Sequence, residues 1–336
     1  MNWKIAACAE QGSSHKSRGV PCQDKVGFYA DDSIVITALA DGAGSYTYAE
    51  LGAEITIKTA INVFKDSFDQ IISCDDAYEA RCIILDAIVD AIKEKATELQ
   101  VQDIIEFSAT LLITAVKDGQ YLVFHVGDGV IAYVKNNVIN VASKPVNGEY
   151  ANQTFFCTCP EPYENADIIK GPVDDIMAFI LMSDGVEASF YDFKTETLSQ
   201  DLIRIPRWTV LYPAETMEES LRDALVSYIC LNTGDDCSIA VMAQKKYAGE
   251  ALHSFSESDM ERLFEFKETN PNKRKKRIQK IRAFFEAASC EKGCSSANAA
   301  KILDCGKRHV DNKLQKFIDA GVIEKNKTNG NYMLSK

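Results

Sequence analysis

The stretch Ser33-Ile-Val-Ile-Thr-Ala-Leu-Ala-Asp-Gly-Ala-Gly-Ser45 is the part of the sequence from which the fold can be worked out. Its apolar run, Ile34–Ala40, has the length of one strand, and Asp41 and the glycines after it end the run. An apolar run of this length between turn residues is typical of a buried strand. Val26–Ala30 precedes it across Asp31-Asp32, so we predict a hairpin with the Asp41 carboxylate at the rim of a core sheet.

Outward from this hairpin, the chain up to about residue 250 reads as a succession of strands interrupted by long helices. We predict strands at 4–9, 109–117, 121–126, 130–135, 176–182 and 238–242, and helices at 47–68, 76–99 and 218–231. Residues 143–175 and 187–216 show no regular pattern. Mostly antiparallel strands with few helices favour the α+β class, with sheets packed together and helices outside.

Length and composition are those of an ordinary globular protein. The chain has 336 residues, 46% of them hydrophobic and 26% charged, which favours about two domains. Apolar runs of strand length are too short to cross a membrane, which takes about 18 residues. We expect no membrane segment and no secretory signal. Eleven irregularly spaced cysteines favour a reducing, cytoplasmic setting.

The charge is unevenly distributed along the chain. Residues 271–336 contain 16 basic and 6 acidic side chains, a net charge of +10, whereas the remainder has a net charge of −22. Such asymmetry predicts two parts with different partners. We therefore expect a domain at 1–250, a helix and basic linker at 251–277, and a small basic domain at 278–336.

Several aspartates stand at the ends of predicted core strands. Each alone is an ordinary turn residue. Together they would repel one another at one sheet edge unless a cation neutralised them, and oxygen ligands favour Mg²⁺ or Mn²⁺. Two such ions could activate a water for attack on a phosphorus centre. The residues concerned are Asp24, Asp41, Asp128, Asp184 and the pair Asp235 and Asp236.

These residues belong to motifs that occur in the order seen in a known family. The chain resembles the metal-dependent protein serine/threonine phosphatases of type 2C, in their bacterial form, over about residues 3–245. The matching pieces are Ser14-His, Gly19-Val-Pro-Cys-Gln-Asp24, Ala40-Asp-Gly-Ala-Gly-Ser45, Ala49-Glu with Gly52-Ala, Ser108-Ala-Thr-Leu-Leu, His125-Val-Gly-Asp-Gly129, Leu181-Met-Ser-Asp-Gly-Val186 and Gly234-Asp-Asp-Cys-Ser-Ile-Ala-Val241.

The resemblance implies a four-layer α-β-β-α sandwich with two metal ions at one end. Asp41 would bridge both ions, and the Gly42 carbonyl would hold the second. Asp184 and Asp235 would hold the first, with Asp235 preferred to Asp236. Two further carboxylates complete the implied site: Asp24, which would contact metal-bound water, and Asp128, which matches the position of a weaker third ion.

The sequence departs from the family pattern at three places. Ala43 replaces the usual histidine that is a candidate general acid, so proton delivery would fall to metal-bound water or to another group, for which His15 is a candidate. Arg18 stands one residue out of register for the arginine that holds the substrate phosphate, and the alternative is an ordinary arginine of a surface loop. Ala188 replaces a frequent acidic residue associated with the third metal. The two-metal core is intact, so an active enzyme is expected.

The implied function is hydrolysis of phosphoserine and phosphothreonine in phosphoproteins, through a water that bridges two Mg²⁺ or Mn²⁺ ions. The alternative is a phosphatase-like binding or regulatory module, which its C-terminal domain could hold on DNA.

Residues 278–336 read as one helix, a helix–turn–helix and a hairpin turning at Asn329-Gly330, which resembles a winged helix-turn-helix domain. In that class the second helix of the pair enters the DNA major groove. Here it would present basic and polar side chains either to DNA or to an acidic protein surface. These side chains are Lys307, Arg308, His309, Asn312 and Lys313.

Four residues in the same region could instead bind zinc. Cys290, Cys294, Cys305 and His309 are ligand types that zinc prefers. The alternative is a structural role, in which the cysteines are buried as small hydrophobic residues at the turns of the helix-turn-helix.

Overall fold

The computed structural model describes residues 2–146, 154–159, 163–264, 270–290 and 292–334. These residues group into two compact units. The first contains Ile5–Ile203 and Glu218–Met242, and the second contains Asn2–Lys4, Arg204–Met217 and Ala243–Lys336.

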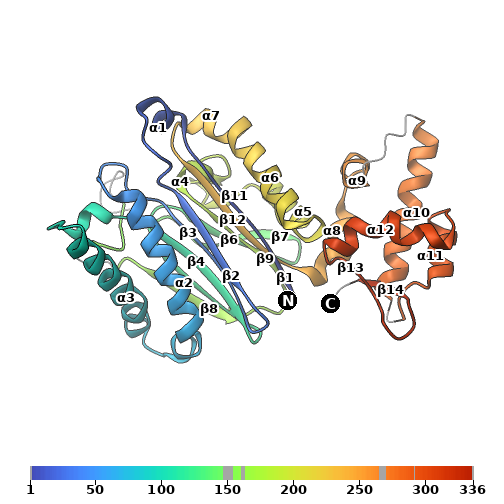
Figure 1. The fold of residues 1–336 in the computed structure, drawn as a ribbon, viewed down its shortest axis with the longest axis horizontal. Helices are drawn as coiled ribbons and strands as arrows, with labels where there is room; N and C mark the ends of the chain where they lie inside the picture. Colours follow the sequence, from blue (N-terminus) through green and yellow to red (C-terminus); the bar gives the residue numbers. More distant parts are fainter. Residues whose placement is uncertain (1, 147–153, 160–162, 265–269, 291, 335–336) are drawn as a thin grey trace. The chain divides into compact units, whose positions relative to one another are not determined.

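Two five-stranded sheets make up the first unit (Figure 1). One has the strand order β1-β12-β9-β6-β7 and the other β2-β3-β4-β5-β8, and every pair with a described register is antiparallel. Strand β9 contacts β3 and β4, so the sheets pack face to face. The bounds are β1 Trp3–Glu10, β12 Cys237–Gln244, β9 Ile176–Met182, β6 Val130–Lys135 and β7 Val138–Ser143, then β2 Lys25–Ala30, β3 Ile34–Ala40, β4 Leu111–Lys117, β5 Gln120–Val126 and β8 Asp167–Pro172.

Helices α2 (Ala49–Ser73) and α3 (Ala77–Glu98) cover the β2–β8 sheet. Their apolar faces and the strands form one core, in which Phe64 and Ile84 are fully buried. The predicted helix start at Asp76 is confirmed, because its side chain accepts a hydrogen bond from the Tyr78 N–H. The α+β class with antiparallel sheets is likewise confirmed.

On the opposite side of the sandwich lie the second half of α6 (Ala214–Ala224), a π-helical turn at Leu225–Ile229, and α7 (Cys230–Thr233) (Figure 1). A single regular helix at 218–231 was the expectation, and the π turn departs from it. The wider turn keeps Leu225 and Cys230, five residues apart, both buried.

Two segments without a sequence pattern contain regular structure, which corrects the prediction. Strand β8 pairs with β5 as an edge strand, where Gly171 and Pro172 are tolerated. Residues 187–216 contain a small hairpin and helix α5 (Arg204–Leu211). Pro206 within α5 is the reason that no helix was expected there. Further short elements of this unit are α1 Ser13–Arg18, α4 Asp184–Glu187, β10 Tyr191–Asp192, β11 Thr197–Leu198 and the 3-10 turns Ile104–Phe107 and Gln200–Ile203.

The second unit is helical, with one hairpin. Buried aromatic rings at its centre, including Phe285 and Phe317 with centroids 5.3 Å apart, join α10 to α12. The elements are α5 Arg204–Leu211, a 3-10 turn at Lys245–Tyr247, α8 Ala248–Ser254, α9 Glu257–Phe264, α10 Pro271–Ser289, α11 Ser296–Ile302, a 3-10 turn at Lys307–His309, α12 Val310–Asp319, β13 Ile323–Lys325 and β14 Tyr332–Leu334.

The basic run expected to be a linker is helical. Asn270 caps α10 by accepting hydrogen bonds from two backbone N–H groups, and Pro271 occupies the first helical turn. Residues 271–277 are therefore the start of α10, and residues 265–269 of the expected linker lie outside the described part of the chain. The proline and the charges suggested a linker, but both suit a helix N-terminus and an exposed helix face.

All eleven cysteines are free. Among the helices of the described residues, none is both long and apolar enough to span a bilayer.

Candidate functional site

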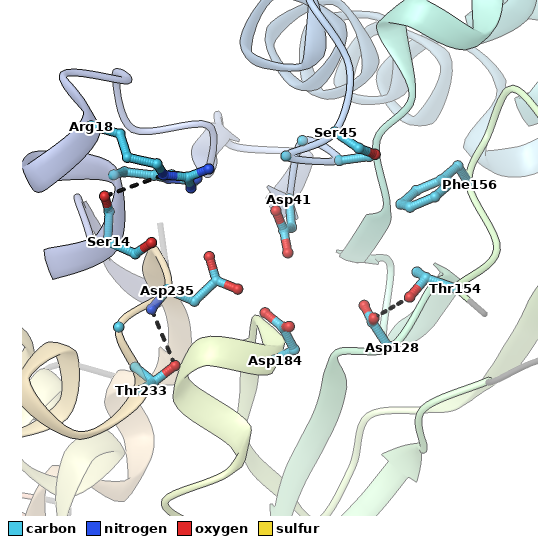
Figure 2. A pocket seen from close by; sticks show the side chains of 15 residues that line it. Ser14, Arg18, Asp41, Ser45, Asp128, Thr154, Phe156, Asp184, Thr233 and Asp235 are labelled. Carbon is cyan, nitrogen blue, oxygen red and sulfur yellow. Dashed lines mark hydrogen bonds between the residues drawn. The ribbon is translucent and has the colours of Figure 1, made fainter. Parts of the chain in front are cut away.

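A cavity of about 620 Å³ opens in the first unit, at the ends of strands from both sheets. Figure 2 shows the carboxylates of Asp41, Asp184 and Asp235 directed into the same space, with Asp128 at its side. Each comes from a different strand end: Asp41 follows β3, Asp128 follows β5, Asp184 follows β9 and Asp235 precedes β12. The sandwich thus brings together carboxylates that are far apart in the sequence.

Asp41 is held by the strand beside it. Its N–H donates to Thr110 Oγ1 (2.9 Å), and the Thr110 N–H donates to the Asp41 carbonyl (2.8 Å). At Gly42 the chain runs against the start of α2, where an added Cβ would lie 2.5 Å from the Ala49 carbonyl oxygen. Only glycine fits at this position, and Gly42 itself lines the cavity.

Burial raises the pKa of Asp41 well above its ordinary value, and the charges of Asp24, Asp184 and Asp128 raise it further. The same causes, burial first and then Asp128 and Asp235, raise the pKa of Asp184 to about 7. These carboxylates therefore compete for protons, which is the behaviour expected where a cation is needed to balance them.

Asp24 is 1% exposed and lies behind the cavity. Its Oδ2 accepts a hydrogen bond from Ser238 Oγ (2.6 Å), while Oδ1 is buried without a hydrogen-bond partner. Burial raises the pKa of Asp24 to about 6, although hydrogen bonds from Ser238 and neighbouring groups oppose the shift. An orphaned buried oxygen beside other carboxylates is suited to a water or a cation.

Asp184 begins α4, and the turn there depends on Gly185. An added Cβ on Gly185 would overlap the Asp236 carbonyl oxygen. The Gly185 N–H donates to Asp184 Oδ1 (2.6 Å). The close approach of the two backbones therefore places Asp184 and Asp235 at the same cavity.

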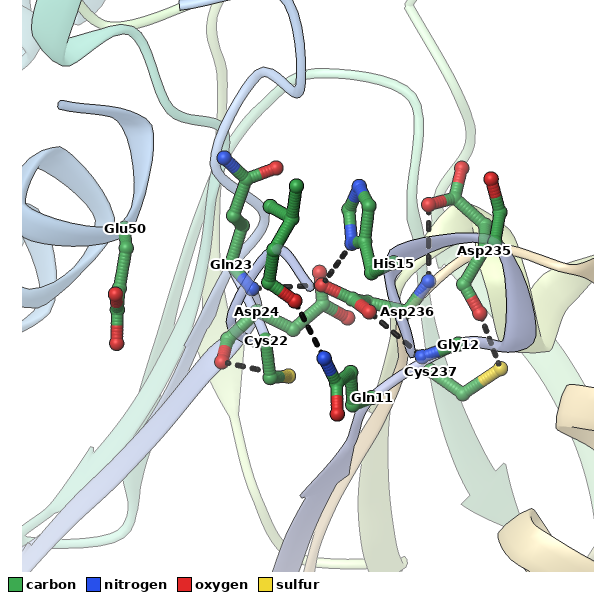
Figure 3. A network of polar contacts seen from close by, with 12 residues as sticks. Gln11, Gly12, His15, Cys22, Gln23, Asp24, Glu50, Asp235, Asp236 and Cys237 are labelled. Atoms are coloured by element: carbon green, nitrogen blue, oxygen red, sulfur yellow. Dashed lines mark hydrogen bonds and ion pairs between the residues drawn. The ribbon is translucent and has the colours of Figure 1, made fainter. Parts of the chain in front are cut away.

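The neighbouring carboxylates Asp235 and Asp236 face different surroundings (Figure 3). Asp235 is exposed and lines the cavity. Asp236 is buried and accepts hydrogen bonds from the N–H groups of Gly12 (2.7 Å) and Gln23 (2.6 Å). Its Oδ2 also lies 2.8 Å from His15 Nδ1. Asp236 thus anchors the loop that carries His15 and Arg18.

His15 and Arg18 both line the cavity from α1. His15 is 5% exposed, and Arg18 is exposed with its Nε donating to the Ser14 carbonyl oxygen at 3.4 Å. On the other wall, Asp128 accepts a hydrogen bond from Thr154 Oγ1 (2.5 Å). Thr154 and Phe156 extend the cavity wall from a segment that has no sequence pattern.

Two polar residues that the motifs did not single out also belong to this region. Ser238 donates a hydrogen bond to Asp24. Its position two residues after Asp236 is the feature of the sequence that could have indicated this role. Glu187 is 4% exposed, and burial, followed by the charges of Asp184 and Asp128, raises its pKa to about 9. Glu187 is three residues after Asp184 and immediately precedes Ala188, the position at which the family often has an acidic residue.

Across the described ranges, no three His, Cys, Asp or Glu side chains are close enough together to hold one metal ion directly. The zinc set of Cys290, Cys294, Cys305 and His309 is therefore not assembled. The cavity carboxylates too stand apart from one another, around a space with room for water. Oxygen donors, unbalanced negative charge and an orphaned Asp24 oxygen fit hydrated Mg²⁺ or Mn²⁺ better than zinc.

The fold and the site together define an α+β sandwich with an acidic cavity at one end. The family model described as protein phosphatase 2C matches residues 11–226, and the chain belongs to that family. The matched residues include four of the strand-end aspartates and stop before Asp235.

Individual relatives agree with this assignment. Serine/threonine-protein phosphatase 3 of Escherichia coli is 27% identical over 165 residues, which cover 47% of this chain and 64% of that protein, slightly under two thirds of its length. A crystal structure of a bacterial serine phosphatase is similar with a TM-score of 0.50 at 14% identity, covering 71% of this chain and 97% of that one. A Caenorhabditis elegans sex determining protein has a TM-score of 0.52 at 13% identity, covering 72% and 65%. At these identities the two structures show the fold.

Proposed function

We propose that the protein is a phosphatase that hydrolyses phosphoserine or phosphothreonine in proteins with the help of Mg²⁺ or Mn²⁺. The observation that carries the proposal is the convergence of Asp41, Asp184 and Asp235, with Asp128 beside them, on one cavity. Burial and mutual repulsion disfavour the charged form of Asp41 and Asp184, and a bound cation would stabilise that form.

The residues divide the task of holding two ions among them. Asp41 would serve both ions and the Gly42 carbonyl the second, while Asp184 and Asp235 would serve the first. Asp24 would hold metal-bound water, and Asp128 would serve a further, weaker ion. When bound, such ions supply positive charge for the phosphate and lower the pKa of a water between them.

Arg18 and His15 would act on the substrate itself. Arg18 is exposed at the cavity wall, and its guanidinium can bind two phosphate oxygens. Asp236 beside His15 Nδ1 favours a proton on that atom, which leaves Nε2 to face the Gly44 side of the cavity. A protonated His15 could deliver a proton from Nε2 to the departing serine oxygen, a role for which Ala43 has no group.

Hydrolysis of p-nitrophenyl phosphate with and without Mn²⁺ tests the proposal. We expect activity that chelator removes and that Asp41→Asn abolishes, while Asp75→Asn on the exposed α2–α3 turn leaves it unchanged. Full activity in excess chelator would contradict the proposal. Metal binding without turnover on any phosphopeptide would favour the alternative, a phosphatase-like regulatory module.

The second unit supports a second proposal, that residues 278–336 form a winged helix that binds a polyanion. The basic run of α10 and the expected recognition helix share one surface: Lys280 Nζ lies 2.8 Å from Asp304, and the charges of Lys280, Lys313 and Lys276 lower the pKa of Asp304. At the hairpin, Tyr332 donates to Asp311 of α12 (2.6 Å), which ties the expected wing to that helix.

Either DNA or an acidic protein would fit this surface. DNA binding predicts a gel shift that weakens with salt and is lost in Lys307→Ala/Arg308→Ala. A matched change, Lys327→Ala/Lys292→Ala, leaves the expected recognition helix intact. Absence of any shift would favour an acidic protein partner.

A further inference from the structure

A cluster of exposed apolar side chains borders the cavity. Tyr228 and Leu231 are the most exposed large hydrophobic side chains of the described residues, at 72% and 71%, and Val226 is 39% exposed. Single exposed apolar residues need no explanation, but three within six residues form a patch. We name Val226, Tyr228 and Leu231 the apolar ridge.

The backbone connects the ridge directly to the cavity. The ridge lies on the π turn and α7, and the next residues, Thr233, Gly234 and Asp235, line the cavity. The Gly234 carbonyl accepts a hydrogen bond from the Ser14 N–H (2.9 Å), which fixes this segment against α1 and its Arg18. The ridge and the proposed phosphate-binding arginine are thus held on one continuous wall.

The local backbone is also unusual. A π turn is rare, occurs mostly as a single turn within α-helices and is found frequently at functional sites. Here it keeps Leu225 and Cys230 buried while Val226, Tyr228 and Leu231 are exposed to solvent. The fold therefore maintains an exposed apolar face beside the cavity at a cost in regular helical geometry.

We propose that the apolar ridge docks an apolar side chain of the phosphoprotein substrate, a few residues from the phosphorylated serine or threonine. This inference rests on the proposed phosphatase activity. An extended peptide advances about 3.3 Å per residue, so a side chain near the phosphorylated residue can reach a wall that adjoins the cavity. Three side chains expose far less surface than the roughly 800 Å² that each partner of a stable dimer buries, which favours a short segment over a second copy.

The test uses fluorescein-labelled phosphoserine peptides of Gly, Ser and Lys with one Leu moved through the flanking positions, and full-length protein with Mn²⁺. We expect one Leu position to raise kcat/KM about tenfold. Tyr228→Ser/Leu231→Ser should remove that preference and leave p-nitrophenyl phosphate hydrolysis unchanged. The control Phe28→Ser changes a side chain that is 55% exposed on β2, and it should keep the preference.

Three results would overturn the docking role: no preference for any Leu position, a preference that survives in the double variant, or self-association of the wild type that the double variant abolishes. If the wild type hydrolyses neither peptide nor aryl phosphate, the proposed phosphatase function fails instead. The same labelled peptides then report binding by fluorescence anisotropy, and a Leu preference lost in the double variant would still support the ridge.

Discussion

At the scale of single residues, the raised pKa values of the cavity carboxylates make stability depend on pH. Asp24 and Asp184 have folded-state pKa values of about 6 and about 7, above those of unfolded carboxyls. The folded protein therefore binds more protons than the unfolded chain between pH 4 and 7. Metal-free protein should lose stability, on the order of a few kcal/mol, as the pH rises through this range.

Urea denaturation in chelator at pH 5 and pH 7.5 measures this loss, and Mn²⁺ should restore more stability at pH 7.5 than at pH 5. Asp184→Asn should flatten the pH dependence in chelator and remove the response to Mn²⁺. The exposed carboxylate Asp75 offers a control, since Asp75→Asn should behave as wild type. Equal stability of metal-free protein at both pH values would contradict the prediction.

Arg18 gives a second prediction at this scale. If its guanidinium binds the substrate phosphate, Arg18→Ala should raise KM for p-nitrophenyl phosphate about tenfold, and Arg18→Lys should recover only part of the loss because an ammonium cannot form the two-oxygen fork. Steady-state kinetics on both variants and on Lys16→Ala, an exposed lysine of the same helix, provide the measurement. A loss of the same size in Lys16→Ala would indicate a general charge effect.

The sequence allowed the aspartates of the site to be predicted because each ends an apolar strand that is easy to recognise. What could not be predicted is how each carboxylate is held. Ser238 contacts Asp24 from 214 positions away, and Thr154 contacts Asp128 from 26 positions away. No local sequence pattern indicates contacts between residues so far apart in the chain. The division of Asp235 and Asp236 into an exposed and a buried carboxylate likewise depends on the packing of Gly12 and Gln23.

At the scale of elements, the α4 turn depends on a close approach of two backbones. Gly185→Ala would push α4 away from the Asp236 carbonyl, so we expect it to destabilise the fold by roughly 1–3 kcal/mol and to weaken Mn²⁺ binding through Asp184. Gly44→Ala adds the same atom at the cavity rim, 3.3 Å from a Gln23 side chain that can shift, and should cost much less stability. Thermal denaturation and Mn²⁺ titration compare the two, and similar losses would refute the argument.

Elements with strong periodicity, such as α2, α3 and β9, were predictable because one continuous face or run is buried. Strand β8 was not, because an edge strand alternates weakly and here ends in Lys170, Gly171 and Pro172. The π turn could not be predicted either. The five-residue spacing between Leu225 and Cys230 indicates such a turn only when both residues are known to be buried.

At the scale of the whole molecule, the sequence predicts the end of the first domain near residue 250, where the family resemblance ends, whereas the charge changes near residue 271. Residue 250 instead lies inside α8, which packs on α5 within the second unit. Trp208 of α5 has its ring centroid 4.5 Å from that of Phe255, and the Arg262 guanidinium lies 5.7 Å above the indole. Charge asymmetry located the basic part of the chain, but it could not reveal that α5, earlier in the sequence, shares a core with it.

This packing leads to a prediction about truncation. A chain ending at residue 250 loses Leu252, Phe255 and Arg262, so Trp208 should become exposed and its fluorescence emission should shift to the red. A chain ending at residue 264 keeps these contacts and should retain the emission of the full-length protein. Removal of one buried aromatic side chain costs about 2–3 kcal/mol, so the shorter chain should also melt earlier. Identical emission and melting of the two truncations would mean that α8 does not stabilise α5, and that the predicted boundary near residue 250 is the physical one.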